Sequence, residues 1–303
     1  MQGGVAQTIG LVLAVNARLR GLPLAAFWPT ASIFRSCKCV DFVGRKRRGL
    51  LVVERDACLG DPAAWLATTP SSATGARLRL VARNQLYISN RVRVAFANGG
   101  PMLLAELQGA RPAEAWRGEW RIQDRYNPEK RIWGVTYRNV ADAVALEPGE
   151  EPTLAMACAD IEQAIERSIA FSRKHGMLFD ECFGRALARL CSDDPCAGMV
   201  HQDMLPDGLM DLDHRRLFGC CAAAWVFGGM GTWNDWGFHG EEQLTYEELS
   251  NRLFDAVIQG LAVATNSTGP WARRGEAACG EDPVPFPAGG KGARGGGPRQ
   301  PSR

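Results

Sequence analysis

The sequence predicts an α+β fold: a β-rich N-terminal half, built mainly from antiparallel strands, followed by a C-terminal bundle of about four helices. Between about residues 32 and 146, short runs of alternating apolar and polar residues are separated by turn residues, and this period of two is typical of half-buried strands. After residue 152, apolar residues recur every three to four positions, as in amphipathic helices. Because strands and helices are segregated along the chain, an α+β class is favoured over an alternating one.

Composition divides the chain into four expected regions. Residues 1–21 form an apolar segment expected to be helical, residues 22–150 a β-rich domain, residues 151–267 a helical domain, and residues 268–303 a tail rich in Gly, Pro and Arg. The tail has too few apolar residues to offset the entropy of ordering it, so we expect it to be disordered. The sequence EPGEEP at 147–152 marks the expected linker between the two larger domains.

Several segments of the N-terminal half have the alternation or composition of strands, namely 77–81, 91–96, 102–107, 116–122, 131–137 and 143–146. The alternation is clearest in 91–96, where Val92, Val94 and Phe96 would share one face and the arginines the other. Arginines at alternating positions normally form the solvated face of a strand.

The first two predicted helices follow the linker. Apolar residues between 161 and 169 share one helix face, and Gly176 is suited to end that helix because glycine readily adopts the left-handed conformation found there. Residues 179–190 have the pattern of the next helix.

The third and fourth predicted helices have capping signals. Asp211 or Asp213 is suited to cap the third helix. Thr245 and Glu248 have the spacing of a capping box for the fourth helix, whose apolar stripe fades at Asn266. Four amphipathic helices this close in sequence are expected to share a core.

Charge, hydropathy and cysteine content narrow the function classes. The net charge of +2 provides no strong field toward nucleic acid. The apolar run 5–15 is interrupted by Gln7 and Thr8 and is shorter than the roughly 20 residues that a membrane-spanning helix needs. The ten cysteines of this long chain are better explained as reduced thiols than as a disulfide scaffold. We therefore expect a cytoplasmic protein without membrane association.

The segment from 225 to 242, WVFGGMGTWNDWGFHGEE, is the best candidate for a functional site. Its glycines allow the chain to turn sharply, and its indole rings and polar groups are a combination found in small-molecule pockets. The predicted ligand- or partner-binding residues are Trp233, Trp236, Asn234 and Phe238. The favoured alternative is that the segment is a structural plug, because large aromatic side chains are more often core.

Asp235, His239, His201 and Asp213 are the candidates for catalysis. Carboxylate and imidazole groups that converge can transfer protons or hold a metal ion that activates water. Their spacing matches neither the H-E-x-x-H nor the EF-hand motif, so no metal ligand is predicted. The alternative is a polar loop in which an aspartate caps the third helix.

Three functions remain open from the sequence. The leading interpretation is a binding or regulatory protein that uses the aromatic segment to engage a protein partner or a small molecule. The second is a hydrolase-type enzyme with an Asp/His site near the GGMGTWND turn, with or without a metal. The third is a nucleic-acid-associated protein that uses the basic run 45–48, and it is the least expected because no nucleic-acid motif is present. The sequence identifies no cofactor.

Overall fold

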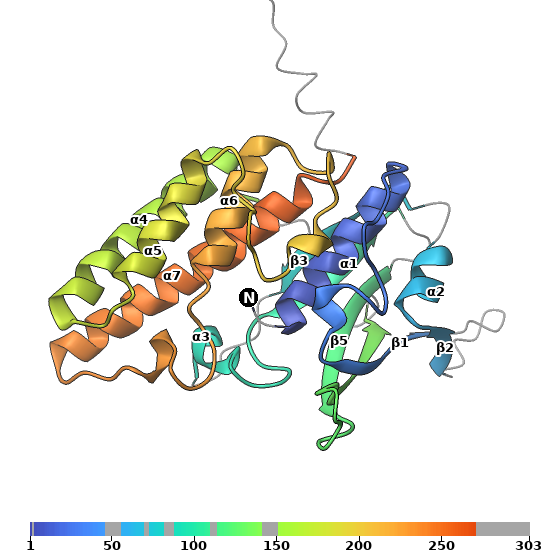
Figure 1. Ribbon diagram of the computed structural model, residues 1–303, viewed down its shortest axis with the longest axis horizontal. Coiled ribbons are helices and arrows are strands. Elements are labelled where there is room, and N and C mark those ends of the chain that lie inside the picture. The colour runs from blue at the N-terminus through green and yellow to red at the C-terminus, as the bar shows by residue number, and fades with distance from the viewer. Residues whose placement is uncertain are drawn as a thin grey trace, which may run out of the picture.

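The computed structural model describes residue 1 and residues 3–45, 56–69, 73–81, 88–109, 114–140 and 151–270. Within these ranges the fold is α+β, with a mixed sheet from the N-terminal half beside a helical bundle from the C-terminal half (Figure 1). This confirms the predicted fold class. The predicted strand 143–146, the basic residues 46–48 and nearly all of the predicted tail lie outside the described residues.

The sheet contains six described strands in the order β2-β1-β6-β5-β4-β3. Their bounds are β1 (Cys37–Arg45), β2 (Asp56–Gly60), β3 (Gly75–Val81), β4 (Met102–Gln108), β5 (Glu114–Ile122) and β6 (Trp133–Asn139). Neighbouring strands are antiparallel except β1 and β6, which are parallel. The strands predicted at 77–81, 102–107, 116–122 and 131–137 are confirmed to within a few residues.

The strand predicted at 91–96 is wrong, because the chain there forms the short helix α3 (Asn90–Arg93). Arg91, expected on a solvated face, is only 6% exposed. Its guanidinium donates to Oδ1 of Asn251 at 3.1 Å and to Oδ1 of Asn234 at 3.2 Å, and it lies 5.3 Å from the centroid of the Tyr246 ring. These contacts with the C-terminal half override the local alternation, which is a weak determinant of strand formation.

The C-terminal bundle consists of α4 (Leu154–His175), α5 (Asp180–Ala188), α6 (Leu212–Ala223) and α7 (Glu241–Asn266) (Figure 1). Short 3-10 segments interrupt it, namely η2 (Arg189–Cys191), η3 (Gln202–Met204) and η4 (Trp233–Asp235). Two predicted helix ends are confirmed. Gly176 follows α4 with a φ of 63°, and the side chain of Asp211 accepts a hydrogen bond from the backbone N–H of His214, which caps α6.

The predicted start of the fourth helix is wrong. α7 begins at Glu241, and the Thr245 hydroxyl donates to the Glu241 carbonyl at 3.0 Å within the first turn instead of capping the helix. Glu241 and Glu242 provide the physical reason, because acidic side chains in a first turn are stabilised by the partial positive charge of the helix N-terminus.

The N-terminal helix α1 (Gly3–Leu19) is buried from Val5 to Ala17. It contacts β3, β4, β5 and α7, so it lies between the sheet and the bundle (Figure 1). A helix that is apolar on all sides is typical of a protein core. Burial between the sheet and the bundle therefore explains why this segment is hydrophobic although it is too short for a membrane-spanning helix. None of the described helices is long and apolar enough to cross a membrane.

The edge strand β3 is sealed by two asparagines. Asn16 of α1 donates to the Ala76 carbonyl at 2.8 Å and accepts from the Ala76 N–H at 2.7 Å. Asn266, the last residue of α7, does the same for Leu78, at 3.1 and 2.7 Å. Buried backbone groups without partners are costly, so these carboxamides stabilise the contact between the sheet edge and both helices.

Two small elements complete the described fold. The helix α2 (Pro62–Ala67) packs on β1 and β2, and the 3-10 turn η1 (Ser32–Phe34) contacts α1 and η3. On the covered face of the sheet, Phe42 stacks on Trp65 and on Tyr137, with ring centroids 4.3 and 4.9 Å apart. This aromatic cluster fills the core beside the cavity described next.

Candidate functional site

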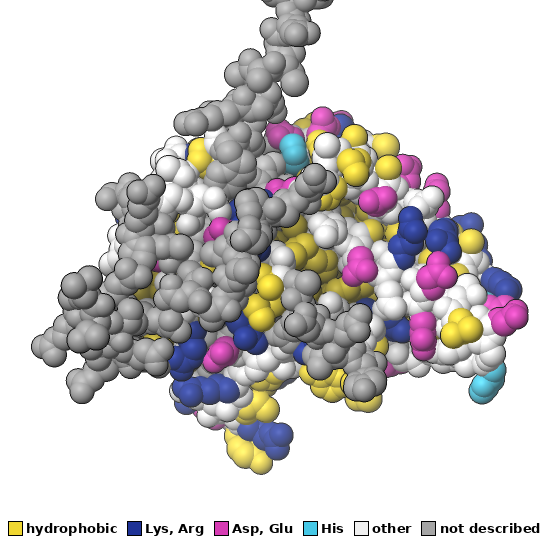
Figure 2. All heavy atoms as spheres, turned by 180° about the vertical axis from the view of Figure 1, so that it is seen from behind, with side chains coloured by type: hydrophobic (Ala, Val, Ile, Leu, Met, Phe, Trp, Pro, Cys, Tyr) yellow, Lys and Arg dark blue, Asp and Glu magenta, His cyan; other side chains and the backbone are white. Residues whose placement is uncertain are grey.

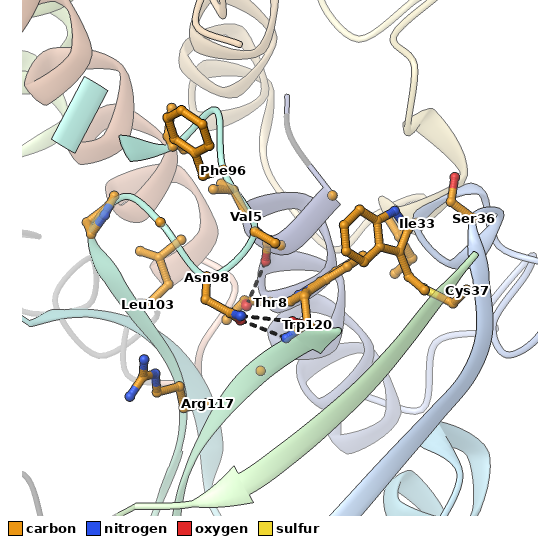
Figure 3. Close-up of a pocket in the computed structure, with 18 of the residues that line it drawn as sticks. Val5, Thr8, Ile33, Ser36, Cys37, Phe96, Asn98, Leu103, Arg117 and Trp120 are labelled. Carbon is orange, nitrogen blue, oxygen red and sulfur yellow. Dashed lines mark hydrogen bonds between the residues drawn. The ribbon is translucent and has the colours of Figure 1, made fainter. Parts of the chain in front are cut away.

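A cavity of about 500 Å³ lies between α1 and the strands β4 and β5 (Figure 3). Its walls are mainly apolar, and they include Val5, Ile33, Phe96, Leu103, Trp120 and Trp133. Several polar residues also reach it, namely Thr8, Ser32, Asn98, Arg117 and His201. This size and this mixture of groups are typical of small-molecule sites, which measure about 300–1,000 Å³.

The cavity exists because β4 and β5 separate. Their last paired residues are Ala105 and Trp116, whereas β5 remains paired with β6 as far as Ile122. The same register would bring Leu104 opposite Arg117 and then Leu103 opposite Gly118, but Leu103 and Gly118 line the cavity instead. The opening therefore lies within the sheet and not at its outer edge.

Asn98 occupies part of this opening. It lies in the loop between α3 and β4 with a φ of 60°, a conformation that asparagine adopts more readily than most residues. Its carboxamide donates to the Trp120 carbonyl at 2.8 Å and accepts from the Trp120 N–H at 2.7 Å (Figure 3). At this position the side chain replaces the strand partner that β4 no longer provides.

Trp120 forms one wall by packing on the first turn of α1. A Cβ at Gly3 would lie 3.1 Å from Cη2 of Trp120, and a Cβ at Gly4 would lie 3.4 Å from its indole nitrogen. Glycine at these positions lets the ring approach the helix backbone. Trp133 meets Trp120 edge-on, with ring centroids 5.9 Å apart. The two indoles provide apolar surface suited to a flat molecule.

A buried hydroxyl lies behind this part of the cavity. Oη of Tyr137 lies near the Thr8 hydroxyl without a well-formed hydrogen bond, and burial raises the pKa of Tyr137 more than this neighbour lowers it. A Cβ at Gly118 would lie 3.3 Å from this oxygen. The neighbouring Thr8 hydroxyl donates its proton to the Gly4 carbonyl at 2.9 Å, so toward Tyr137 it can only accept.

His201 is the one residue of the four catalytic candidates that lines the cavity. Its Nδ1 lies 2.8 Å from Oγ of Ser32. The Asp203 carboxylate accepts from the Ser32 N–H at 2.6 Å and also from the Ser32 hydroxyl. Burial lowers the pKa of His201, which favours the neutral ring. We assign its proton to Nδ1, since the serine proton goes to the carboxylate, and Nε2 is then an acceptor.

This cluster differs from an activated serine. In acyl-transfer triads the imidazole lies between the serine and the carboxylate and takes the serine proton. Here Ser32 contacts His201 and Asp203 directly, and the carboxylate accepts from both its N–H and its hydroxyl. The geometry therefore anchors η1 to η3, and it leaves Nε2 of His201, a residue of the cavity lining, outside this hydrogen-bond cluster.

The other catalytic candidates have separate surroundings. Asp213 forms an ion pair with Arg216 at 3.0 Å, and the Asp235 carboxylate accepts from the Gly231 N–H. His239 is exposed. None of these three candidates lines the cavity, and within the described ranges no group of three or more His, Cys, Asp or Glu residues is placed to hold a metal ion.

Trp233, the first of the predicted ligand-binding residues, is completely buried. Its indole N–H donates to Oγ of Ser250 at 2.7 Å, and its carbonyl accepts from the Tyr246 hydroxyl. These contacts support the interpretation of the aromatic segment as a plug between α5 and α7.

Of the other three predicted ligand-binding residues, Asn234 and Phe238 also face the protein, and Trp236 is partly exposed. Asn234 donates to the Arg91 carbonyl at 2.8 Å in addition to accepting from the Arg91 guanidinium. The half-buried Phe238 packs edge-on against Phe171, with ring centroids 5.1 Å apart. Trp236 is 39% exposed, which leaves part of its ring accessible.

Comparison of the chain with protein families, curated proteins and solved structures finds no match. The functional argument therefore rests on the geometry of the cavity. Sequence reasoning selected His201 but missed Gly118, Trp120 and Asn98. The turn sequence NGGP at 98–101 was a signal for a sharp loop, but nothing in it indicates that the next strand leaves its neighbour.

Proposed function

We propose that this protein binds a small molecule with a flat, mainly apolar body in the cavity between β4 and β5. The observation that supports this function is the separation of two neighbouring strands inside the sheet, which leaves about 500 Å³ lined by aromatic and polar groups. Concave, mainly apolar openings with a few polar groups are the usual form of a small-molecule site. A ligand in this opening would restore contacts that the separated strands lack.

This proposal keeps the binding role expected from the sequence but moves it away from the aromatic segment. Trp233 is fully buried and Asn234 is engaged with Arg91, so a ligand would have to disrupt the fold to reach them. The cavity is accessible without such a change.

An enzymatic role is the second candidate, and His201 is the observation that favours it. A neutral imidazole on a cavity wall can accept a proton from a bound molecule. If the protein is a hydrolase-type enzyme, His201→Gln retains ligand affinity and abolishes turnover. Equal turnover by wild type and variant would remove His201 from the reaction.

Nucleic acid is not the proposed ligand. Two arginines on the strand predicted at 77–81 have acidic partners, since Arg77 pairs with Glu151 and Arg79 pairs with Glu106 at 2.5 Å, and this reduces their capacity to bind phosphate. Figure 2 shows acidic and basic side chains interspersed over the part of the surface drawn in colour. The nine described cysteines are free thiols, which supports the cytoplasm as the proposed compartment.

The test is a thermal-shift screen of flat ring compounds, with tryptophan fluorescence as a second readout. A ligand at 100 times its dissociation constant stabilises the fold by roughly 2.7 kcal/mol. Trp120→Ala should weaken a binder at least about tenfold, because truncating an aromatic anchor costs roughly 2 kcal/mol. Trp236→Ala is the matched control and should leave affinity unchanged. Equal effects of the two variants would contradict binding in this cavity.

A further inference from the structure

The backbone N–H and C=O of Gly118 point into the opening. In an antiparallel pair, successive residues direct both groups alternately toward one neighbour and then the other. Trp120 directs its pair away from β6, since both groups bind Asn98. Ala115 directs its carbonyl toward the β6 side, where it accepts from the Val140 N–H at 2.8 Å. Gly118, two residues before Trp120, therefore points away from β6, and the β4–β5 pairing does not extend to it.

At three places in the described fold, an asparagine side chain binds both the N–H and the C=O of one strand residue. In each case one carboxamide accepts from the N–H and donates to the C=O of a single strand residue, at 2.7–3.1 Å: Asn16 with Ala76, Asn266 with Leu78, and Asn98 with Trp120. A planar amide edge is thus complementary to one strand residue. No side chain of the described residues does this for Gly118, which lines the cavity.

We propose that the ligand carries a cyclic amide edge that pairs with Gly118. Its ring N–H donates to the Gly118 carbonyl, and its adjacent carbonyl accepts from the Gly118 N–H, as in a lactam, an imide or a nucleobase-like ring. This inference rests on the proposed function and narrows its ligand class. The ring takes the place of the missing β4 partner, beside Leu103 and Trp120, which Figure 3 shows on the two strands that border the opening.

The pairing of the neighbouring residues favours a ring over an extended peptide. A peptide added to a strand forms hydrogen bonds with several alternate residues of that strand. On this side of β5, Trp116 is already paired with Ala105 and Trp120 is already paired with Asn98. Between them, Gly118 alone directs its backbone groups to this side. A ligand with one hydrogen-bond donor beside one acceptor can therefore pair with Gly118 alone. A peptide long enough to pair with Trp120 as well would have to displace Asn98.

The test compares three bicyclic compounds of similar size against the full chain by isothermal titration calorimetry. 2-Quinolinone has the amide edge, N-methyl-2-quinolinone lacks the donor, and naphthalene lacks both groups. We expect 2-quinolinone to bind and each of the other two to bind at least about tenfold more weakly, because they leave a buried Gly118 group unpaired. Equal affinity of the three compounds, or tighter binding of naphthalene, overturns the inference while the proposed binding function stands.

Variants of Gly118 provide the protein side of the test. Gly118→Pro removes the N–H without removing a hydrogen bond to β6, because this N–H points away from β6. Gly118→Ala keeps the N–H, and because alanine and proline both place a Cβ about 3.1 Å from the Tyr137 ring, comparing the two variants isolates the N–H. The proline variant should bind 2-quinolinone at least about tenfold more weakly than the alanine variant. If Gly118→Pro does not fold, the comparison of the three compounds decides.

The two proposals fail in different ways. If none of the three compounds above binds and a wider screen of ring compounds also yields no binder, the proposed function fails. If the screen yields binders without an amide edge and 2-quinolinone does not bind, only the present inference fails. If an uncharged tetrapeptide binds more tightly than 2-quinolinone and displaces it, strand addition replaces the cyclic amide.

Discussion

Trp233 is held by contacts that leave none of its ring exposed. Trp233→Ala should therefore destabilise the fold by about 3–5 kcal/mol, the usual result of removing a large core aromatic. The Trp236 side chain is 39% exposed, so Trp236→Ala should lower the free energy of unfolding by less than about 1 kcal/mol. Urea unfolding of both variants measures the difference. A loss at Trp233 no larger than that at Trp236 would mean that the aromatic segment is not a plug.

His201 predicts a pH dependence of stability. Burial lowers its pKa in the folded protein, so the unfolded chain takes up this proton first as the pH falls. His201 does not lower the stability of the fold above the pKa of histidine in the unfolded chain, about 6.5. Below that pH the unfolded chain binds the proton more readily, so the loss of stability caused by His201 grows as the pH falls. Wild type should lose more stability between pH 7.5 and 5.5 than His201→Gln. Parallel pH profiles of the two proteins would contradict this assignment.

Asparagine carboxamides connect secondary-structure elements in this fold. Asn16 of α1 satisfies both backbone groups of Ala76 on β3, and replacing it leaves both groups buried without partners. Asn16→Leu should lower the free energy of unfolding by about 2–4 kcal/mol. Gln259→Leu, at an exposed position of α7, is the control and should change it by less than about 0.5 kcal/mol. An Asn16 variant as stable as this control would show that α1 does not seal the edge.

The elements divide into those that local sequence determines and those that it does not. Gly176 and Asp211 act at helix ends through their own backbone preference or side chain, so their roles were predictable. Thr245 and Arg91 were misassigned because the deciding contacts lie elsewhere. The two glutamates before Thr245 extend α7, and three residues more than 140 positions away hold Arg91.

Arg91 also links the two halves of the molecule. It extends from α3 to Asn234 and Asn251 and lies over the Tyr246 ring. Arg91→Lys should cost about 1–3 kcal/mol, because an ammonium group cannot reproduce the planar, forked donors of a guanidinium. Arg93→Lys, on the same short helix and partly exposed, should cost less than about 0.5 kcal/mol. Thermal unfolding measures both, and equal effects would remove Arg91 as a link.

At the scale of the whole molecule, the fold class was predictable but the cavity was not. Alternation and helical periodicity are local, and they identify strands without their partners. The cavity depends on where the pairing of β4 with β5 ends and on a loop that places Asn98 beside Trp120. Gly118 is one of 34 glycines, and its role follows only from the direction of its backbone groups.

The most direct test of the open strand pairing is amide hydrogen exchange, followed by NMR on protein labelled with 15N-glycine. Gly134 is the internal control, because it lies in β6 between Cys39 of β1 and Arg121 of β5. The Gly118 amide should exchange at least about tenfold faster than the Gly134 amide, and a bound cyclic amide should slow it. Equal protection of the two glycines would show that β4 and β5 are paired at Gly118, and the proposed site would then not exist.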